Sequence, residues 1–149
     1  MGNTQLLDNA KTRNLGLLIL RAGVGILFFV FGWQKIAGGE QVWNGVGGAM
    51  QFVGISAWPV FWGLMATLAE FAGGLLLAVG LFTRPAAAFL AFTMIMATIL
   101  KGATGTGIMD WYAPFTMLLI MIFFIMNGGG VYSIDSVIRS KKHAGKLAA

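Results

Sequence analysis

An acidic side chain stands near the middle of a long apolar stretch of this chain. Glu70 lies within the run from Trp58 to Phe82, which is long enough to cross a bilayer. An ionisable group at that depth costs at least about 2 to 3 kcal/mol, so such residues usually face the interior of a helix bundle and often mark a working site. The alternative role is structural, with the carboxyl group only holding helices together.

Two basic side chains accompany small residues on another predicted helix. The stripe at helical spacing comprises Arg21, Gly25, Phe28, Gly32 and Lys35. A second stripe comprises Gly63, Glu70, Gly73 and Gly74. Because small residues let helix backbones approach closely, we expect the two stripes to face each other. Glu70, Arg21 and Lys35 are therefore the predicted ligand or proton pocket.

The depth of Arg21 complicates a direct bond to Glu70. Counting about 1.5 Å per residue, Arg21 lies about 9 Å and Glu70 about 18 Å from the same end of two antiparallel helices. A salt bridge across this difference requires a long reach, helix tilt or a bridging water. Alternatively, the Arg21 side chain extends to the lipid headgroups.

Further polar and aromatic residues are expected at the opposite ends of the helices. Lys101 and Asp110 fall there with Trp33 and Trp58, and together they are the predicted outer vestibule. The simpler interpretation is that the lysine anchors the helix at the interface and that Asp110 caps a helix N-terminus.

The composition indicates an integral membrane protein. The chain has 149 residues, 58% of them hydrophobic and 10% charged, with a mean hydropathy of +0.81. Cysteine is absent, and the single histidine, His143, lies in a polar tail, so no intrinsic metal or haem site is evident. The formal charge of +5 comes from basic residues that flank apolar segments, which argues against nucleic-acid binding. The methionines are interpreted as adaptable packing and not as metal ligands.

The apolar segments predict an all-α, four-helix transmembrane bundle that forms a single domain over residues 1–149. The helices are expected at about residues 15–33, 58–82, 85–100 and 111–126, with a basic tail at 131–149. The Arg84 and Pro85 pair should end the second helix, and Pro114 should lie in the first turn of the fourth. Ser133 could cap a short helix within the tail.

The long first outer connection, from Gln34 to Ala57, admits two interpretations. Trp43, Val46, Met50 and Val53 recur at helical spacing, which favours an interfacial or partly re-entrant segment. The glycines of this region equally favour a solvated loop.

Charge and tryptophan placement together predict the orientation. Seven basic residues fall on one side of the expected membrane and only Lys35 and Lys101 on the other. Because cytoplasmic flanks are rich in Lys and Arg, both termini are expected in the cytoplasm of a bacterium, with the chain in the inner membrane. All five tryptophans then lie at or near the outer interface.

Three motifs in order resemble the DoxX family of membrane proteins. They are the run Leu20–Gly25 with Phe28, Phe29, Gly32 and Lys35; the run from Glu70 through Gly73–Leu77 to Gly80–Arg84; and Gly128–Gly130 with Tyr132–Asp135. The resemblance implies a four-helix bundle whose relatives include subunits linked to quinone-dependent thiosulfate oxidation and redox-stress complexes. The resemblance implies that Arg21, Lys35 and Glu70 correspond to polar positions of the family. Gln34 and Lys101 depart from the family pattern, in which histidine is common at the first position and frequent near the second.

The leading hypothesis is a membrane subunit of a redox complex that contacts quinone, with electrons supplied by partner subunits. No catalytic centre is evident in the chain alone. The alternatives are a small proton-coupled or solute transporter that acts as an oligomer, and a structural scaffold for a larger complex. Membrane lipids and either other subunits or further copies of this chain are the expected partners.

Overall fold

The structure is a computed structural model that describes residues 2–105 and 107–147, with side chains described over 9–105 and 107–141. The described residues form helices and contain no strand. Five α-helices and one 3-10 helix follow one another as α1 (Gly2–Gly47), η1 (Gly48–Val53), α2 (Pro59–Val79), α3 (Thr83–Thr104), α4 (Ile108–Asn127) and α5 (Ile134–Leu147). Helices α1 to α4 are each long and apolar enough to span a membrane. The predicted bundle of four membrane-spanning helices is therefore confirmed.

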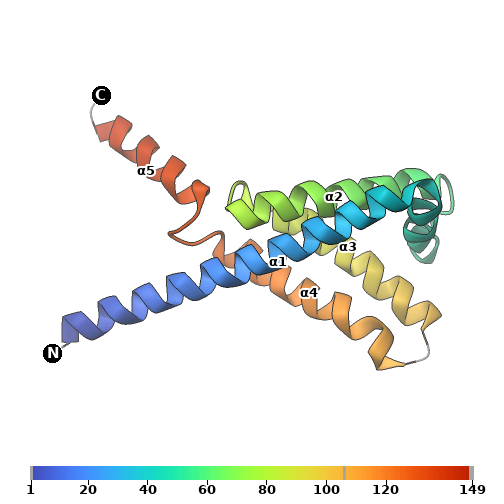
Figure 1. The fold of residues 1–149 in the computed structure, drawn as a ribbon, viewed down its shortest axis with the longest axis horizontal. Coiled ribbons are helices and arrows are strands. Elements are labelled where there is room, and N and C mark those ends of the chain that lie inside the picture. The colour runs from blue at the N-terminus through green and yellow to red at the C-terminus, as the bar shows by residue number, and fades with distance from the viewer. Residues whose placement is uncertain (1, 106, 148–149) are drawn as a thin grey trace.

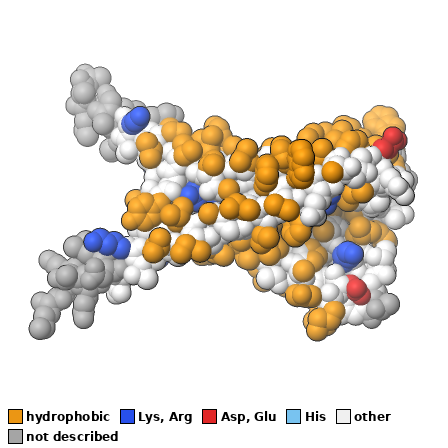
Figure 2. Space-filling model, viewed as in Figure 1, with side chains coloured by type: hydrophobic (Ala, Val, Ile, Leu, Met, Phe, Trp, Pro, Cys, Tyr) orange, Lys and Arg blue, Asp and Glu red, His pale blue; other side chains and the backbone are white. Residues whose placement is uncertain are grey.

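The bundle consists of two helical hairpins joined between α2 and α3 (Figure 1). The ends of α1 and α5 that carry the chain termini lie at the same end of the molecule, here called the terminal end, and η1 lies at the other, here called the η1 end. Hydrophobic side chains cover the length of the bundle, and most charged side chains in view lie near its two ends (Figure 2). This distribution suits helices surrounded by lipid.

The first helix is longer than the sequence predicted. It continues past Trp33 to Gly47, with a break at Gly39, whose φ of 63° and ψ of −155° are accessible essentially only to glycine. η1 then follows directly, so most of the predicted connection is helical. The helical spacing from Trp43 to Val53 was the informative signal, whereas the glycines produce a kink and do not unfold the segment.

The other helix boundaries also differ from the predicted ones. Helix α2 ends at Val79, before Phe82, because Gly80 adopts a φ of 75° and its amide donates back to the carbonyls of Leu76 and Leu77. Helix α4 starts at Ile108, because Asp110 accepts a bond from the Gly107 amide and caps this end. Pro114 thus lies in the second turn of α4 and not in the first.

The basic tail predicted at 131–149 is largely a helix, α5, which projects away from the bundle (Figure 1). Ser133 caps it as anticipated, because the Ser136 amide donates to the Ser133 hydroxyl at 3.2 Å. The helix runs to Leu147, so it is longer than the short helix predicted within the tail.

The largest apolar core lies among all four spanning helices. It contains Phe28 of α1, Leu77 of α2, Leu90 of α3 and Phe124 of α4, each at most 2% exposed. A smaller cluster joins Ala49 and Met50 of η1 to Met96 of α3. Helix η1 therefore packs on the bundle and is not a solvated loop.

Candidate functional site

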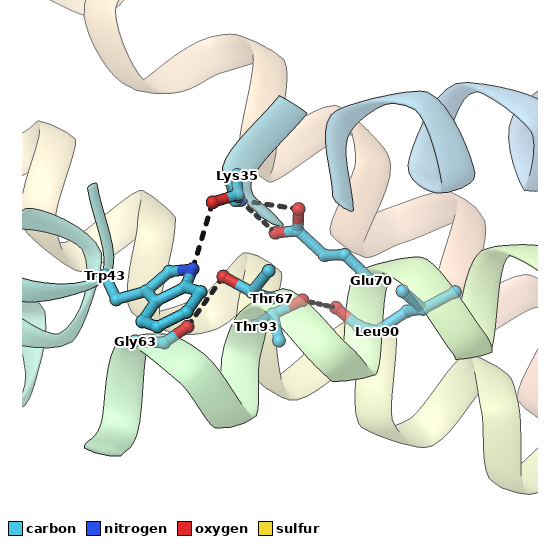
Figure 3. A network of polar contacts seen from close by, with 7 residues as sticks. All are labelled: Lys35, Trp43, Gly63, Thr67, Glu70, Leu90 and Thr93. Atoms are coloured by element: carbon cyan, nitrogen blue, oxygen red, sulfur yellow. Dashed lines mark hydrogen bonds and ion pairs between the residues drawn. The ribbon is translucent and has the colours of Figure 1, made fainter. Parts of the chain in front are cut away.

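Lys35 of α1 and Glu70 of α2 form a close ion pair inside the bundle (Figure 3). The Lys35 Nζ lies 2.5 Å from each carboxylate oxygen of Glu70. The Glu70 side chain is 3% exposed and the Lys35 side chain 25% exposed. The carboxylate thus faces protein and a cation, as expected for an acidic group at membrane depth.

Small residues set the register that makes this pair. A Cβ atom added at Gly32 would collide with the backbone of Phe71, and one at Gly25 with the backbone of Ala78. In both contacts the two residue numbers add to 103, so position 33 of α1 lies opposite Glu70. Lys35 is two residues further on, an axial offset of about 3 Å, which a lysine side chain spans easily. The predicted face-to-face packing of the two glycine-bearing stripes is confirmed.

The same register separates Arg21 from Glu70 and corrects the predicted three-residue pocket. In this register Arg21 lies opposite position 82, beyond the end of α2 and about 18 Å from Glu70 along the helix axis. The Arg21 side chain is 1% exposed and its Nη2 donates to the carbonyl oxygen of Tyr132 at 2.9 Å. It is therefore not paired with Glu70, and it is buried within the protein at the terminal end.

The backbone carbonyl of Lys35 is bonded by the indole group of Trp43, a residue that the sequence had not placed in the site. The Nε1 of Trp43 donates to the Lys35 carbonyl oxygen at 2.9 Å (Figure 3). This bond forms close to the break at Gly39, where α1 leaves regular helical geometry. Trp43 in turn lies against Gly63, where an added Cβ would collide with the Trp43 backbone. After the kink, Trp43 therefore contacts both Lys35 and the first half of α2, close to the ion pair.

Two cavities share the ion pair as part of their walls. The first has a volume of about 390 Å³ and lies among the end of α1, η1, α2 and α3, with Met50, Trp62, Phe92 and Thr93 in its lining. The second has a volume of about 640 Å³ and lies among α1, α3 and α4, with Phe31, Gln34, Met94 and Met117 in its lining. Lys35, Glu70, Ala97 and Lys101 line both. The pair can therefore be reached from two sides.

The predicted outer vestibule is brought together only in part. Lys101 lines both cavities and adds a second cation to their walls. Asp110 instead caps α4 through the Gly107 amide. Trp33 packs its ring against Phe71 with the centroids 6.2 Å apart, and the Trp58 side chain is 77% exposed. Neither tryptophan is among the residues that line the two cavities.

The charge and polarity of the site favour an amphiphilic ligand. Lys35 and Glu70 neutralise each other, so Lys101 leaves the cavity walls with a formal charge of +1. Thr93 lines the first cavity and directs its hydroxyl group to a carbonyl oxygen of its own helix at 2.8 Å, and the buried Thr67, outside the lining, does the same. The remaining lining is predominantly apolar. Among the residues that the structure describes, no group of three or more His, Cys, Asp or Glu side chains is placed to hold a metal ion.

Several lining residues escaped the sequence analysis as site residues. Gln34 was noted only as a departure from a family pattern, and it lies in the second cavity together with Lys101, the other departure. Thr93 and Met96 carry no signal in the sequence that distinguishes them from core residues. Their place in the first cavity depends on where η1 folds back against α3.

A second polar cluster lies at the terminal end and connects α5 to the α2–α3 turn. Asp135 accepts bonds from the backbone amides of Phe82 and Thr83, at 2.8 Å each, and thereby caps α3 from another part of the chain. Its own amide donates to the Gly80 carbonyl at 2.9 Å. Burial opposes ionisation, but the bonds from Thr83 and Phe82 and the charge of Arg139 outweigh it, so the pKa of Asp135 lies below its ordinary value.

Comparison with known proteins relates the chain to a family of membrane proteins. A sequence model of the DoxX family matches residues 16–103. The chain is 31% identical to "Inner membrane protein YqjF" of Escherichia coli K12, over 88% of this chain and 98% of the relative. It is 30% identical to "Putative oxidoreductase CatD" of Bacillus subtilis 168, over 93% of this chain and 98% of the relative. "Inner membrane protein YphA" of E. coli K12 is 26% identical, over 91% of this chain and 99% of the relative. No solved structure matches the chain at a significant level.

Proposed function

This chain belongs to the DoxX family of membrane proteins, and we propose that it is a quinone-binding subunit of a redox complex in the bacterial inner membrane. The observation that carries the proposal is the pair of apolar cavities that meet at Lys35 and Glu70. The names of two relatives refer to the inner membrane, and the name of a third refers to an oxidoreductase. These names support the setting, and the cavities support the quinone that the sequence resemblance led us to expect.

The dimensions and chemistry of the cavities suit a quinone. Ligand pockets commonly enclose about 300 to 1,000 Å³ and combine apolar walls with a few polar groups, and both cavities fall in this range. A quinone supplies an electron-accepting ring with two carbonyl oxygens and an apolar tail. Aromatic and aliphatic side chains, such as Phe31 and Met117 in the larger cavity, would contact its apolar parts.

The polar groups of the site have distinct parts in this proposal. An ammonium group has three N–H donors, so Lys35 retains one after bonding both oxygens of Glu70. That donor and the ammonium of Lys101 would orient a carbonyl oxygen of the ligand. The Glu70 carboxylate holds the Lys35 ammonium in place beside both cavities.

Electrons would reach the site from a partner subunit. The chain contains no cysteine, and its single histidine, His143, lies outside the residues whose side chains are described. Much of the surface of α4 is apolar and exposed, including Phe115 (40%), Leu119 (52%) and Ile122 (42%). Lipid covers such a surface in the membrane, and a partner's helix would fit it equally well.

Quinone retention tests the proposal. We expect the full-length protein, purified from its native membrane with its bound lipids, to carry quinone. Because a hydrogen bond to a charged group contributes about 1.5 to 3 kcal/mol, Lys101→Gln and Glu70→Gln should each lower the quinone content by about tenfold or more. Solvent extraction followed by chromatography measures this content, with Glu40→Gln, an exposed carboxylate on α1, as the matched control.

Two results would contradict a quinone site. One is wild-type quinone content in both variants, provided that their melting curves show folded protein. The other is quinone-free wild-type protein that, in liposomes, takes up a solute under a pH gradient in a manner dependent on Glu70. The second result would favour the transporter alternative.

A further inference from the structure

A third cavity lies at the terminal end, about 20 Å along α1 from the Lys35–Glu70 pair. Its volume is about 380 Å³, and it is enclosed by the α2–α3 turn, the glycine loop after α4 and the first turns of α5. We call it the basic corner and define it by Thr83, Arg84, Gly128–Gly130, Asp135 and Arg139. None of these residues lines the two cavities described above.

The basic corner concentrates positive charge. Arg84 and Arg139 line the cavity, and Arg21 lies directly behind it, against Gly80 and Ser133. The buried Nε and Nη1 of Arg21 have no hydrogen-bond partner. Asp135 is the one acidic residue in the lining, and both of its oxygens are engaged by the backbone amides that begin α3. Three guanidinium groups against one carboxylate leave a formal charge of +2.

The cavity also offers hydrogen-bond donors and space for an anion. The exposed Arg84 uses its Nη2 to bond the Met126 carbonyl at 3.2 Å, and a guanidinium group has five N–H donors in all. Gly128 and Gly130, with φ of 71° and 75°, form a wall without side chains next to Arg84 and Leu17. A planar guanidinium group with free N–H groups is well suited to bond two oxygens of a phosphate.

Exposed apolar side chains surround this charged cavity. Phe82 and Val131 are each 62% exposed, and both also line the cavity. Helix α5 continues from it with Ile134, Val137 and Ile138, which are 42 to 51% exposed. Where spanning helices end, such side chains can contact acyl chains while basic groups meet the headgroups. The surroundings thus favour an amphiphile over a fully soluble anion.

We propose that the basic corner is a binding site for the phosphate group of an anionic membrane lipid. Arg84 and Arg139 bind the phosphate oxygens, and Arg21 contributes charge from behind the cavity wall. Phe82, Val131 and the apolar face of α5 contact the acyl chains. The bound lipid joins α5 to the α2–α3 turn, in addition to the bonds made by Asp135.

Native mass spectrometry with defined lipids tests the site. Detergent-solubilised full-length protein is offered phosphatidylglycerol and phosphatidylcholine in equal amounts, and we expect it to retain the anionic lipid preferentially. Since each basic group near a membrane surface contributes about 1 kcal/mol, Arg84→Gln or Arg139→Gln should reduce this preference about fivefold and the double variant about thirtyfold. Arg84→Lys, which keeps the charge, should retain more of the preference than Arg84→Gln.

The control is Arg13→Gln, which removes the same charge from an exposed position on α1 outside the cavity and should leave the preference unchanged. An equal loss in this variant would mean diffuse attraction to basic residues and would overturn the proposal. Wild-type preference in the folded double variant would overturn it as well. Displacement of the lipid by millimolar inorganic phosphate, or binding of phosphate without lipid, would show that the site serves a soluble anion instead.

Discussion

At the scale of single residues, the Lys35–Glu70 ion pair joins α1 to α2 inside the bundle. Glu70 is almost fully buried, so its charge depends on Lys35 at 2.5 Å. Buried pairs of this kind contribute little net stability compared with apolar residues of similar size, but removing one partner leaves an uncompensated charge. Net stability therefore does not by itself account for the pair, and its functional role stays a prediction.

Substitutions of the pair test this explanation. Lys35→Met and Glu70→Leu should each destabilise the protein by about 3 kcal/mol, because the remaining partner is left buried without its counter-charge. The double variant should lose less than either single variant, since no charge remains. Unfolding in detergent, followed by tryptophan fluorescence, measures the three free energies. Additive losses would mean that the two side chains do not interact.

At the scale of elements, the α2–α3 turn depends on a residue 52 positions away in the chain. Helix α3 begins after Phe82, a non-glycine residue with a φ of 49°, and it has no side-chain cap of its own. Asp135 supplies the missing acceptors for the amides of Phe82 and Thr83. The first turn of α5 thus caps the N-terminus of α3. The motif made of Gly128–Gly130 and Tyr132–Asp135 therefore contributes to the structure of the bundle.

This contact predicts a pH dependence of stability. Because the pKa of Asp135 is lower in the folded protein than its ordinary value, its contribution is complete above the ordinary value, near pH 4, and is lost as the pH falls through the folded value. At pH 7, Asp135→Asn should cost about 1 to 2 kcal/mol, a modest figure because the group is only partly buried.

Melting temperatures measured between pH 7 and pH 3 check this prediction. The difference between wild type and Asp135→Asn should begin to shrink as the pH falls below about 4, where the unfolded chain takes up a proton at Asp135, and it should shrink further as the pH falls through the lower pKa of the folded protein. Glu40→Gln, which changes an exposed carboxylate, should melt like the wild type throughout this range. A difference between wild type and Asp135→Asn that stays constant with pH would contradict the assignment of Asp135 as the cap.

At the scale of the whole molecule, the two ends of the bundle differ in charge. Arg84, Arg139 and Lys141 lie at the terminal end with the basic start of α1, whereas Lys101 lines the cavities toward the η1 end. The α1 and α5 ends lie at the same end of the molecule, in agreement with four crossings (Figure 1). The excess of basic residues there favours a cytoplasmic location for both termini.

Reporter fusions test this orientation. A fluorescent protein fused after Ala149 should fold and fluoresce, and alkaline phosphatase fused there should be inactive, because only the periplasm supports its disulfides. The same phosphatase inserted between Gly54 and Trp58, in the turn between η1 and α2, should be active. The opposite pattern of activities would place the terminal end in the periplasm.

The sequence alone determined how many helices cross the membrane, that Glu70 faces protein, and that glycine-bearing faces of the first two spanning helices pack together. These properties follow from the hydropathy and helical spacing of neighbouring residues, which act locally. The helical spacing of apolar residues around Trp43 also indicated a helix there, although the glycines of this region predicted a loop equally well.

Only the tertiary structure decided which cation meets Glu70. Arg21 and Lys35 share one helical face, so periodicity could not distinguish them, and the choice depended on the axial register set by Gly25 and Gly32 against α2. The two cavities and the capping of α3 by Asp135 likewise depend on contacts between distant segments. A linear pattern specifies which way each side chain faces, but the partner it meets there depends on how far one helix is shifted along another.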